Sequence, residues 1–380
     1  MGFEMTKEMI AFQKMLKAFV ENEVKPFAQE TDEEEKFPVE IAKKMGDLGF
    51  YKIVLPKEYG GAGGNYQMYS LAVSEVAKAC ATSSTVLSAH VSLCMAPIYE
   101  NGTEEQKRKY LPKLATGEWL GAFGLTEPNA GSDAAGQQTF AVLDGDEWVL
   151  NGSKIFITNA GYAHVYIIFA MTNKSLGLKG ISAFIVEDGT PGFTIGKKEL
   201  KMGIRGSSTC ELIFENCRIP KDNILGQEGK GFVIAMKTLD GGRVGIASQA
   251  LGIAQGALEE TIKYTKERKQ FKKTIASFQN TQFRIADLFT RVEAARLLVE
   301  DAAIAKETKR KDLSMRAAMA KLYAAETAME VTTKCVQMFG GYGYTREYPV
   351  ERMMRDAKIT EIYEGTSEVQ RMVIAGSVLR

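Results

Sequence analysis

The spacing of apolar residues changes twice along the 380 residues of this chain. Up to about residue 118, apolar side chains recur every three or four positions, which is typical of amphipathic helices. From 119 to 225, short runs of β-branched and aromatic residues alternate with turn-forming dipeptides, and from 226 the helical period returns. The sequence therefore predicts an α+β multidomain protein with an N-terminal helical domain (1–118), a middle β domain (119–225) and a C-terminal helical domain (226–380).

Local patterns refine this prediction. The middle segment predicts a small antiparallel β barrel, with turns at Asp144-Gly145, Asn151-Gly152 and Pro191-Gly192. Its expected strands are Glu147–Leu150, Lys154–Thr158, Val165–Met171 and Ile181–Val186. The last domain has three long helical stretches whose lengths suit a four-helix bundle, namely Phe232–Lys263, Thr281–Lys306 and Leu313–Met338.

Charge and composition exclude several functional classes. A net charge of +1 gives no global attraction for nucleic acid or for an anionic membrane surface. No apolar run approaches the ~20 residues that span a bilayer, so we expect no membrane partner. The five cysteines lack paired spacing, which favours reduced thiols and a cytoplasmic location. The only histidines, His90 and His164, lie outside any ligand-like cluster, so we expect no metal site.

Three segments could contact a ligand in a crevice between the domains. The loop Leu125–Asp133 is rich in small hydroxyl and glycine residues, which offer short hydrogen-bond donors. Lys154–Gly161 alternates as a strand and would present Phe156 and Thr158 on one face. Gln337–Tyr344 ends a long helix with glycines. Taken singly, each segment also fits an ordinary loop, strand or helix cap.

A fourth segment, Ile362–Ser367, contains a carboxylate after two apolar residues and just before a helix start. Ser367 and Gln370 match a capping box at that start. A partly desolvated Glu364 would have a raised pKa, which suits proton abstraction near neutral pH. Taken singly, a glutamate is usually a solvated surface residue.

The combination of these motifs, with Glu267–Phe271, closely resembles the acyl-CoA dehydrogenase family over essentially the whole length of the chain. The resemblance implies FAD as the cofactor, extended between the middle domain and the bundle and across a subunit contact of a homotetramer. It further implies an acyl-CoA substrate and an electron-transferring flavoprotein as electron partner.

The resemblance also assigns roles to residues. Glu364 is the implied catalytic base, which removes the α-proton while the β-hydride passes to the flavin. Residues implied to hold the flavin are Phe123, Leu125, Thr126, Ser132, Phe156, Ile157 and Thr158. Those implied to reach a neighbouring subunit's FAD are Arg268, Phe271, Gln279, Gln337, Met338, Phe339, Gly340 and Gly341, with Thr366 and Glu368 as further FAD contacts. Those implied to touch the substrate are Ser132, Asp240, Arg243 and Gly365.

Two positions narrow the resemblance to the short-chain, butyryl-CoA branch. Gly242 stands where the isovaleryl and long-chain branches carry their base, which leaves Glu364 as the family-type base. Ser84 stands where the glutaryl-CoA branch has an arginine, which disfavours a dicarboxylic acyl group. We therefore expect oxidation of a short acyl-CoA to the trans-2-enoyl-CoA. Two alternatives are an enoyl-CoA reductase with a flavoprotein donor, and a non-catalytic member that uses the fold for binding.

Overall fold

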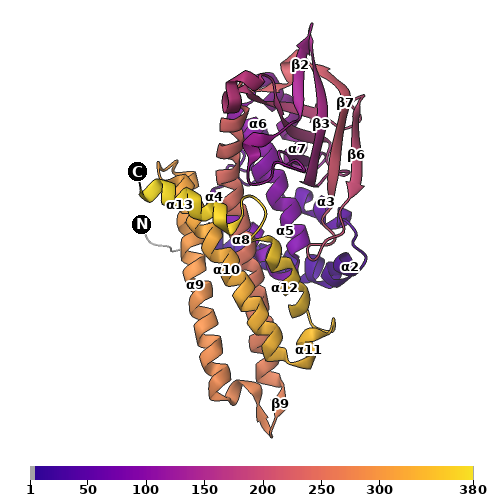
Figure 1. Ribbon diagram of the computed structural model, residues 1–380. Helices are drawn as coiled ribbons and strands as arrows, with labels where there is room; N and C mark the ends of the chain where they lie inside the picture. The colour runs from indigo at the N-terminus through magenta and orange to yellow at the C-terminus, as the bar shows by residue number, and fades with distance from the viewer. Residues whose placement is uncertain (1–4, 380) are drawn as a thin grey trace.

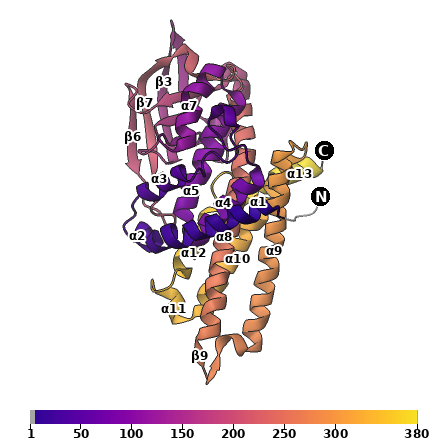
Figure 2. The same ribbon diagram turned by 180° about the vertical axis from the view of Figure 1, so that it is seen from behind.

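The computed structural model describes residues 5–379 and has the predicted helix, sheet, helix order. In Figure 1 the sheet lies at the top, and the long helices of the C-terminal domain extend to the bottom. Figure 2 shows the N-terminal helices, in indigo, on the near side of the molecule between these two parts. The predicted fold class is confirmed.

The N-terminal domain is helical, and three of its helices begin with a polar cap, the first being Thr6 before α1. Asn65 caps α4, and Thr103 with Gln106 forms a capping box that starts α7. A buried histidine joins this domain to the sheet, because His90 Nδ1 accepts the N–H of Gly121 at 3.0 Å. The α-helices are α1 (Lys7–Phe19), α2 (Ala28–Glu33), α3 (Val39–Asp47), α4 (Tyr66–Ala79), α5 (Ala81–Ser88), α6 (Ala96–Asn101) and α7 (Glu104–Thr116), with a π-helix η4 (Ala89–Met95) between α5 and α6.

The middle domain is an eight-stranded sheet with the order β6-β7-β3-β2-β4-β5-β8, in which β1 also pairs with β4. It is mixed rather than wholly antiparallel, because β1 and β2 both pair with β4 in parallel. Within the described residues β6 and β8 do not pair, so the sheet does not close into the predicted barrel. The strands are β1 (Gly121–Gly124), β2 (Phe140–Asp144), β3 (Glu147–Thr158), β4 (Val165–Met171), β5 (Ile181–Glu187), β6 (Phe193–Lys198), β7 (Thr209–Pro220) and β8 (Ile224–Leu225).

One predicted turn is wrong. Asn151-Gly152 lies inside β3, which runs unbroken where we expected two strands. The pairing of β3 with β7 shifts register between Leu150 and Gly152, and Gly152 has φ +136°. A Cβ there would lie 2.6 Å from the hydroxyl oxygen of Thr139, so the glycine permits a bulge instead of a turn.

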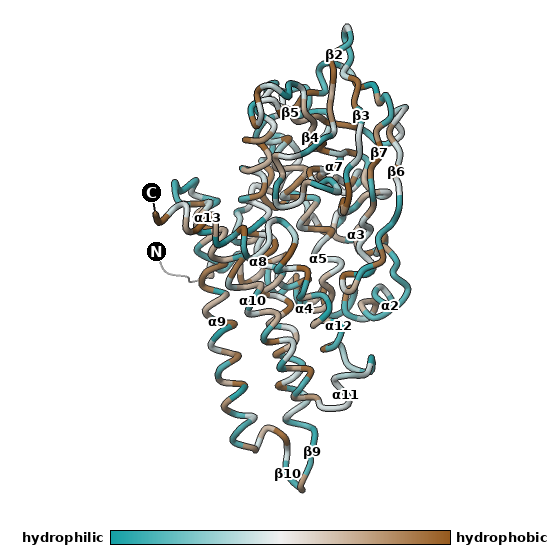
Figure 3. The backbone as a smooth tube through the Cα atoms, in the orientation of Figure 1, coloured by the Kyte–Doolittle hydropathy of each residue, from teal (hydrophilic) through white to brown (hydrophobic). Residues whose placement is uncertain are grey.

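The C-terminal domain consists of three long helices with shorter helices packed against them. Along α9 and α10, hydrophilic and hydrophobic segments alternate (Figure 3). Among all the helices of residues 5–379, none is long and apolar enough to cross a membrane. A two-stranded hairpin, β9 (Lys269–Gln270) and β10 (Lys273–Thr274), forms the tip of the bundle furthest from the sheet (Figure 1). The helices are α8 (Gly231–Glu267), α9 (Gln279–Glu307), α10 (Leu313–Phe339), α11 (Gly341–Tyr344), α12 (Val350–Ile359) and α13 (Ser367–Val378).

Glycines on α8 allow it to pack closely against α4 of the N-terminal domain. A Cβ on Gly252 would lie 2.1 Å from the carbonyl oxygen of Ser74, and one on Gly256 would lie 2.3 Å from that of Lys78. The two helices therefore approach to backbone contact at these positions. As a result α8 belongs to the core of the bundle and to the N-terminal interface at once.

We predict that Gly252→Ala destabilises the protein, because the added methyl group must push α4 and α8 apart. Overpacking of this kind costs about 1–3 kcal/mol. The matched control is Gly241→Ala on the same helix, where the nearest group is the end of the flexible Lys306 side chain at 3.5 Å. There the better helix propensity of alanine should leave stability unchanged or raise it by up to about 1 kcal/mol. Equal thermal unfolding midpoints for the two variants would contradict this packing.

Candidate active site

Glu364 lies in the short connection between α12 and α13, and its carboxylate rests on the backbone of α8. A Cβ on Gly242 would lie only 2.0 Å from Oε2 of Glu364. Real side chains do not approach so closely, so the space for this carboxylate exists because residue 242 is glycine. Glu364 itself has φ +53°, a left-handed conformation that is uncommon outside glycine. The connection thus directs the side chain inward.

The environment of this carboxylate raises its pKa. Oε2 is buried and has no hydrogen-bond partner among residues 5–379. Burial raises the pKa of Glu364 to about 7, against the opposing effect of the nearby Lys321 and Arg243 cations. Glu364 can therefore accept a proton near neutral pH, as a general base must.

Several buried groups hold the Glu364 connection in place. The Tyr363 hydroxyl donates to Oε1 of Gln249 on α8. Lys321 Nζ and Gln370 Nε2 both donate to the carbonyl of Gly365, at 2.7 and 2.8 Å. Sequence reasoning missed Lys321 and Gln249. The signal for Lys321 was a lone lysine among small and apolar residues in the helical segment Ala317–Ala325.

The helix cap after Glu364 differs from the prediction. Thr366, not Ser367, is the N-cap of α13, and its hydroxyl accepts the N–H of Val369 at 3.3 Å. Ser367 is the first helical residue, so the predicted capping box is wrong. The Gln370 side chain is instead engaged with the carbonyl of Gly365, which explains why it does not close the box.

The residues expected to hold the flavin gather at one edge of the sheet. Phe123 lies on β1, Leu125, Thr126 and Ser132 follow it in a loop, and Phe156 to Thr158 end β3. A buried ion pair joins the loop to the strand, with Lys154 Nζ 2.7 Å from Oε1 of Glu127. The same Glu127 accepts the N–H of Thr139 at 3.0 Å. The start of the loop is thereby fixed to β3 and to the residue before β2.

Phe156 is unusual within this group. It has φ +59° and lies at a register shift between β3 and β7, and 57% of it is exposed. Its neighbour Ile157 is buried, whereas Thr158 is partly exposed. A strained, outward aromatic ring has no role in the sheet core, so it is available to a ligand.

The residues expected to reach a neighbouring subunit's cofactor lie elsewhere. Arg268 directly precedes the β9–β10 hairpin, and Phe271 lies in its turn. Gln279 begins α9, and the segment Gln337–Gly341 spans the end of α10. Aromatic neighbours hold two of these residues: Arg268 lies over the Tyr342 ring, 5.3 Å from its centre, and Phe339 stacks on Tyr264. This hairpin is at the opposite end of the molecule from the sheet (Figure 1). One chain does not bring the two sets together.

Of the four residues expected to touch the substrate, Ser132 lies in the loop after β1, and the other three lie near Glu364. Gly365 follows it directly, and Asp240 and Arg243 belong to the same helix as Gly242. Arg243 is buried and pairs with Asp240 at 2.7 Å, while its Nε has no partner in the described part of the chain. The remaining predicted contacts are at the start of α13, close in sequence to Glu364: Thr366 is its N-cap and Glu368 lies in its first turn.

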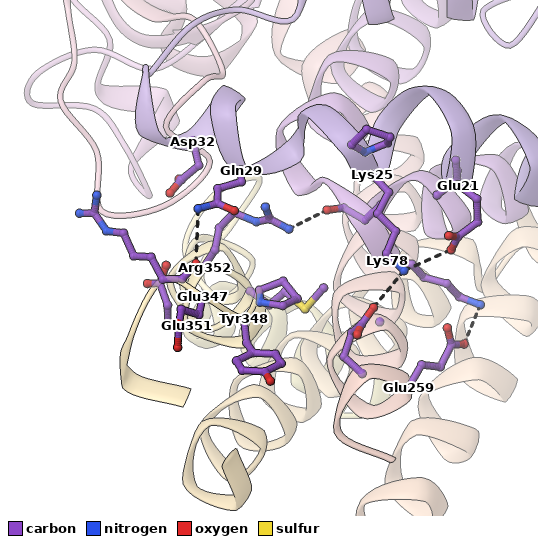
Figure 4. Close-up of a pocket in the computed structure, with 18 of the residues that line it drawn as sticks. Glu21, Lys25, Gln29, Asp32, Lys78, Glu259, Glu347, Tyr348, Glu351 and Arg352 are labelled. Carbon is purple, nitrogen blue, oxygen red and sulfur yellow. Dashed lines mark hydrogen bonds and ion pairs between the residues drawn. The ribbon is translucent and has the colours of Figure 1, made fainter. Parts of the chain in front are cut away.

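A cavity of about 590 Å³ lies apart from this site. Figure 4 shows it lined by charged side chains from the N-terminal helices, α8 and the α12 region. Lys25 pairs with Glu260 at 3.0 Å and Lys78 with Glu259 at 3.1 Å, so these charges neutralise each other between domains. None of the predicted site residues lines this cavity.

Comparison with known proteins agrees with this geometry. Residues 6–118, 122–217 and 229–379 match the models of the acyl-CoA dehydrogenase N-terminal, middle and C-terminal domains. The chain is 59% identical over 380 residues to "Acyl-CoA dehydrogenase, short-chain specific" of Clostridium acetobutylicum, covering 100% of both. It is 53% identical to "Acryloyl-CoA reductase (NADH)" of Anaerotignum propionicum, covering 100% of this chain and 96% of the relative.

A solved structure extends the likeness to the whole fold. It is described as "Electron transferring flavoprotein of Acidaminococcus fermentans: Towards a mechanism of flavin-based electron bifurcation". The matching chain superposes with a TM-score of 0.99 at 54% identity, covering 100% of each chain. With all three domain models and full-length relatives in agreement, the chain belongs to the acyl-CoA dehydrogenase family, whose members are oxidoreductases acting on CH–CH groups.

Proposed function

We propose that this protein is an FAD-dependent dehydrogenase that converts a short-chain acyl-CoA to the trans-2-enoyl-CoA and passes the electrons to an electron-transferring flavoprotein. The observation that carries the proposal is the buried carboxylate of Glu364, without a partner in residues 5–379 and with its pKa raised to about 7. A general base works best when its pKa is near the working pH. Glu364 would take the α-proton.

The backbone beside Glu364 supplies a second element. The N–H of Glu364 forms no hydrogen bond to another described residue, so it is free to donate to the thioester carbonyl. A donor aimed at that oxygen stabilises the negative charge that develops as the α-proton leaves. Gly365, with φ +96°, follows without a side chain, which leaves the backbone open to a substrate.

The residues at the sheet edge fit a flavin. The hydroxyls of Thr126, Ser132 and Thr158 have no hydrogen-bond partner in the described part of the chain, so they can serve a polar ring. The exposed ring of Phe156 offers an aromatic face beside them. FAD, when bound, supplies the acceptor for the hydride that leaves the β-carbon.

We further infer that the protein is a homotetramer in which two subunits share each FAD. The two groups of expected FAD residues lie at opposite ends of one chain, so a second copy must contribute the hairpin end. Large apolar residues in the C-terminal domain also remain exposed, which is typical of an interface. They include Phe271, Phe283, Phe289, Tyr344, Met372 and Leu379.

A relative and one position in the N-terminal domain support a short acyl group without a second carboxylate. The relative from Clostridium acetobutylicum is named short-chain specific. Ser84 is fully buried in α5 and donates to the carbonyl of Val73 at 2.9 Å, so it offers no cation to a distal carboxylate. We therefore propose a short monocarboxylic acyl group such as butyryl, and a cytoplasmic location in keeping with five buried free cysteines.

A second candidate is the reverse reaction, reduction of an enoyl-CoA. The acryloyl-CoA reductase relative favours it. The same Glu364 would then donate the proton to the α-carbon, because a catalyst accelerates both directions. Turnover of crotonyl-CoA with reduced flavoprotein partner, compared with turnover of butyryl-CoA with oxidised partner, distinguishes the two.

Replacing the base should abolish chemistry and leave binding intact. In Glu364→Gln, anaerobic butyryl-CoA should no longer bleach the flavin, although the ligand still perturbs its spectrum, because the amide cannot accept the α-proton. The control is Glu361→Gln, which alters a carboxylate paired with Lys358 on the same connection and should bleach normally. Bleaching of Glu364→Gln at the wild-type rate would show that another group is the base.

The rate should also depend on pH through this group. Only ionised Glu364 is active, so the second-order rate of flavin reduction should rise with pH, level off above about 7, and fall about tenfold per unit well below it. Glu300 on α9 is a matched control, because burial raises its pKa too but it pairs with Arg296. Glu300→Gln should leave the profile unchanged. A wild-type profile that is flat from pH 5 to 9 would contradict a base of this kind.

Shared cofactor sites predict complementation between defective subunits. Phe156→Ala and Arg268→Ala should each reduce FAD content when present in every subunit. Hybrids of the two should regain flavin, because some sites combine an intact sheet edge from one chain with an intact hairpin from the other. Hybrids of Phe156→Ala with Thr158→Ala should regain none, since every sheet edge is damaged. Equal flavin content in both kinds of hybrid would argue against sharing.

A further inference from the structure

Lys321 is a buried cation that no site prediction includes. It lies on α10 and is fully buried, which is rare for a lysine. No carboxylate of residues 5–379 lies within ion-pair distance of its Nζ. Its bond is to a backbone carbonyl, that of Gly365, at 2.7 Å. A buried, unneutralised charge is costly, so its placement next to the base requires a reason.

The carbonyl that Lys321 contacts belongs to the residue after the base. Gln370, also fully buried, donates to the same oxygen at 2.8 Å. Gly365, which carries this carbonyl, and Glu364 before it both have positive φ, +96° and +53°. A non-glycine residue holds such a conformation only when its surroundings enforce it. The paired donors from α10 and α13 do so here.

The charges around the base come from several elements. Lys321 on α10 and Arg243 on α8 are the cations that favour the ionised form of Glu364. Tyr69 on α4 and Tyr363 also lie near it, but burial keeps both phenols neutral. The acids Glu361 and Glu368 lie on the Lys321 side, where they favour its protonated form, although burial lowers the pKa of Lys321 to about 8. Arg243 already pairs with Asp240 at 2.7 Å, which leaves Lys321 as the cation without a contact acid.

We propose that Lys321 is a positioning residue for proton abstraction: it anchors the Gly365 carbonyl, and its positive charge keeps the carboxylate of Glu364 ionised at neutral pH. This inference rests on the proposed function, since it assigns Lys321 a role toward Glu364 as base. A purely structural lysine would fix the backbone and have no effect on the protonation of Glu364.

The test compares variants of the FAD-loaded protein by the pH profile of flavin reduction with butyryl-CoA. Lys321→Met removes donor and charge with similar bulk, and Lys321→Gln removes the charge but retains a donor. Both should move the acid limb of the profile upward by about one pH unit, so that the rate at pH 7 falls roughly fivefold and recovers at higher pH. Gln370→Met removes only a neutral donor, so it should lower the rate at every pH without moving the limb.

The outcomes separate this inference from the proposed function. If the acid limb of the pH profile does not move in the Lys321 variants while Glu364→Gln is inactive, the role of Lys321 is wrong and that of Glu364 stands. Activity in Glu364→Gln would overturn the proposed function itself. If Lys321→Met does not retain FAD, Lys321→Gln gives the same decision, because it keeps a hydrogen bond to Gly365 available. An equal shift of the acid limb in Gln370→Met and in the Lys321 variants would also contradict an effect of the lysine charge.

Discussion

The contact between the Glu364 carboxylate and the bare backbone of Gly242 is the constraint on which the site depends. The Cβ of any side chain at position 242 would lie 2.0 Å from Oε2 of Glu364, which is too close for both atoms to fit. The contact requires α8 to run directly beneath the connection between α12 and α13. The position of the helix is fixed further along its length, where Gly252 and Gly256 lie against carbonyls of α4. The same helix thus provides both the packing of the domains and the space that Glu364 occupies.

The chemistry follows from a balance of opposing effects at that contact. Burial alone would keep Glu364 protonated, and an exposed carboxylate would be too weak a base. The cations of Lys321 and Arg243 oppose the effect of burial, and the result is a pKa of about 7. The positive φ of Glu364 is part of the same arrangement, because it turns the side chain toward α8 while its N–H stays without an internal partner.

The sequence predicts features that depend on residue type or local spacing. It does not predict features that depend on contacts between residues far apart along the chain. Apolar spacing predicted the order of helices and strands, and the glycine-ended helix at Gln337–Gly341 was predicted as a cap, with Gly340 in that place. The sequence pattern predicts a turn at Gly152 because a turn and a bulge use the same dipeptide. The contact with Thr139, just before β2, decides between them. Likewise Lys321 and Gln249 could not be assigned, because their partners, Gly365 and Tyr363, are distant along the chain. The parallel pairing of β1 with β4 has no local signal at all.

We propose that Glu364 removes an α-proton, and acetyl-CoA tests that step alone, since it has α-protons and no β-carbon from which hydride could leave. The FAD-loaded protein would be incubated with acetyl-CoA in deuterated water, and exchange at the methyl group followed by mass spectrometry. We expect exchange catalysed by the wild type and none above background for Glu364→Gln. Exchange at the same rate in both proteins would contradict it.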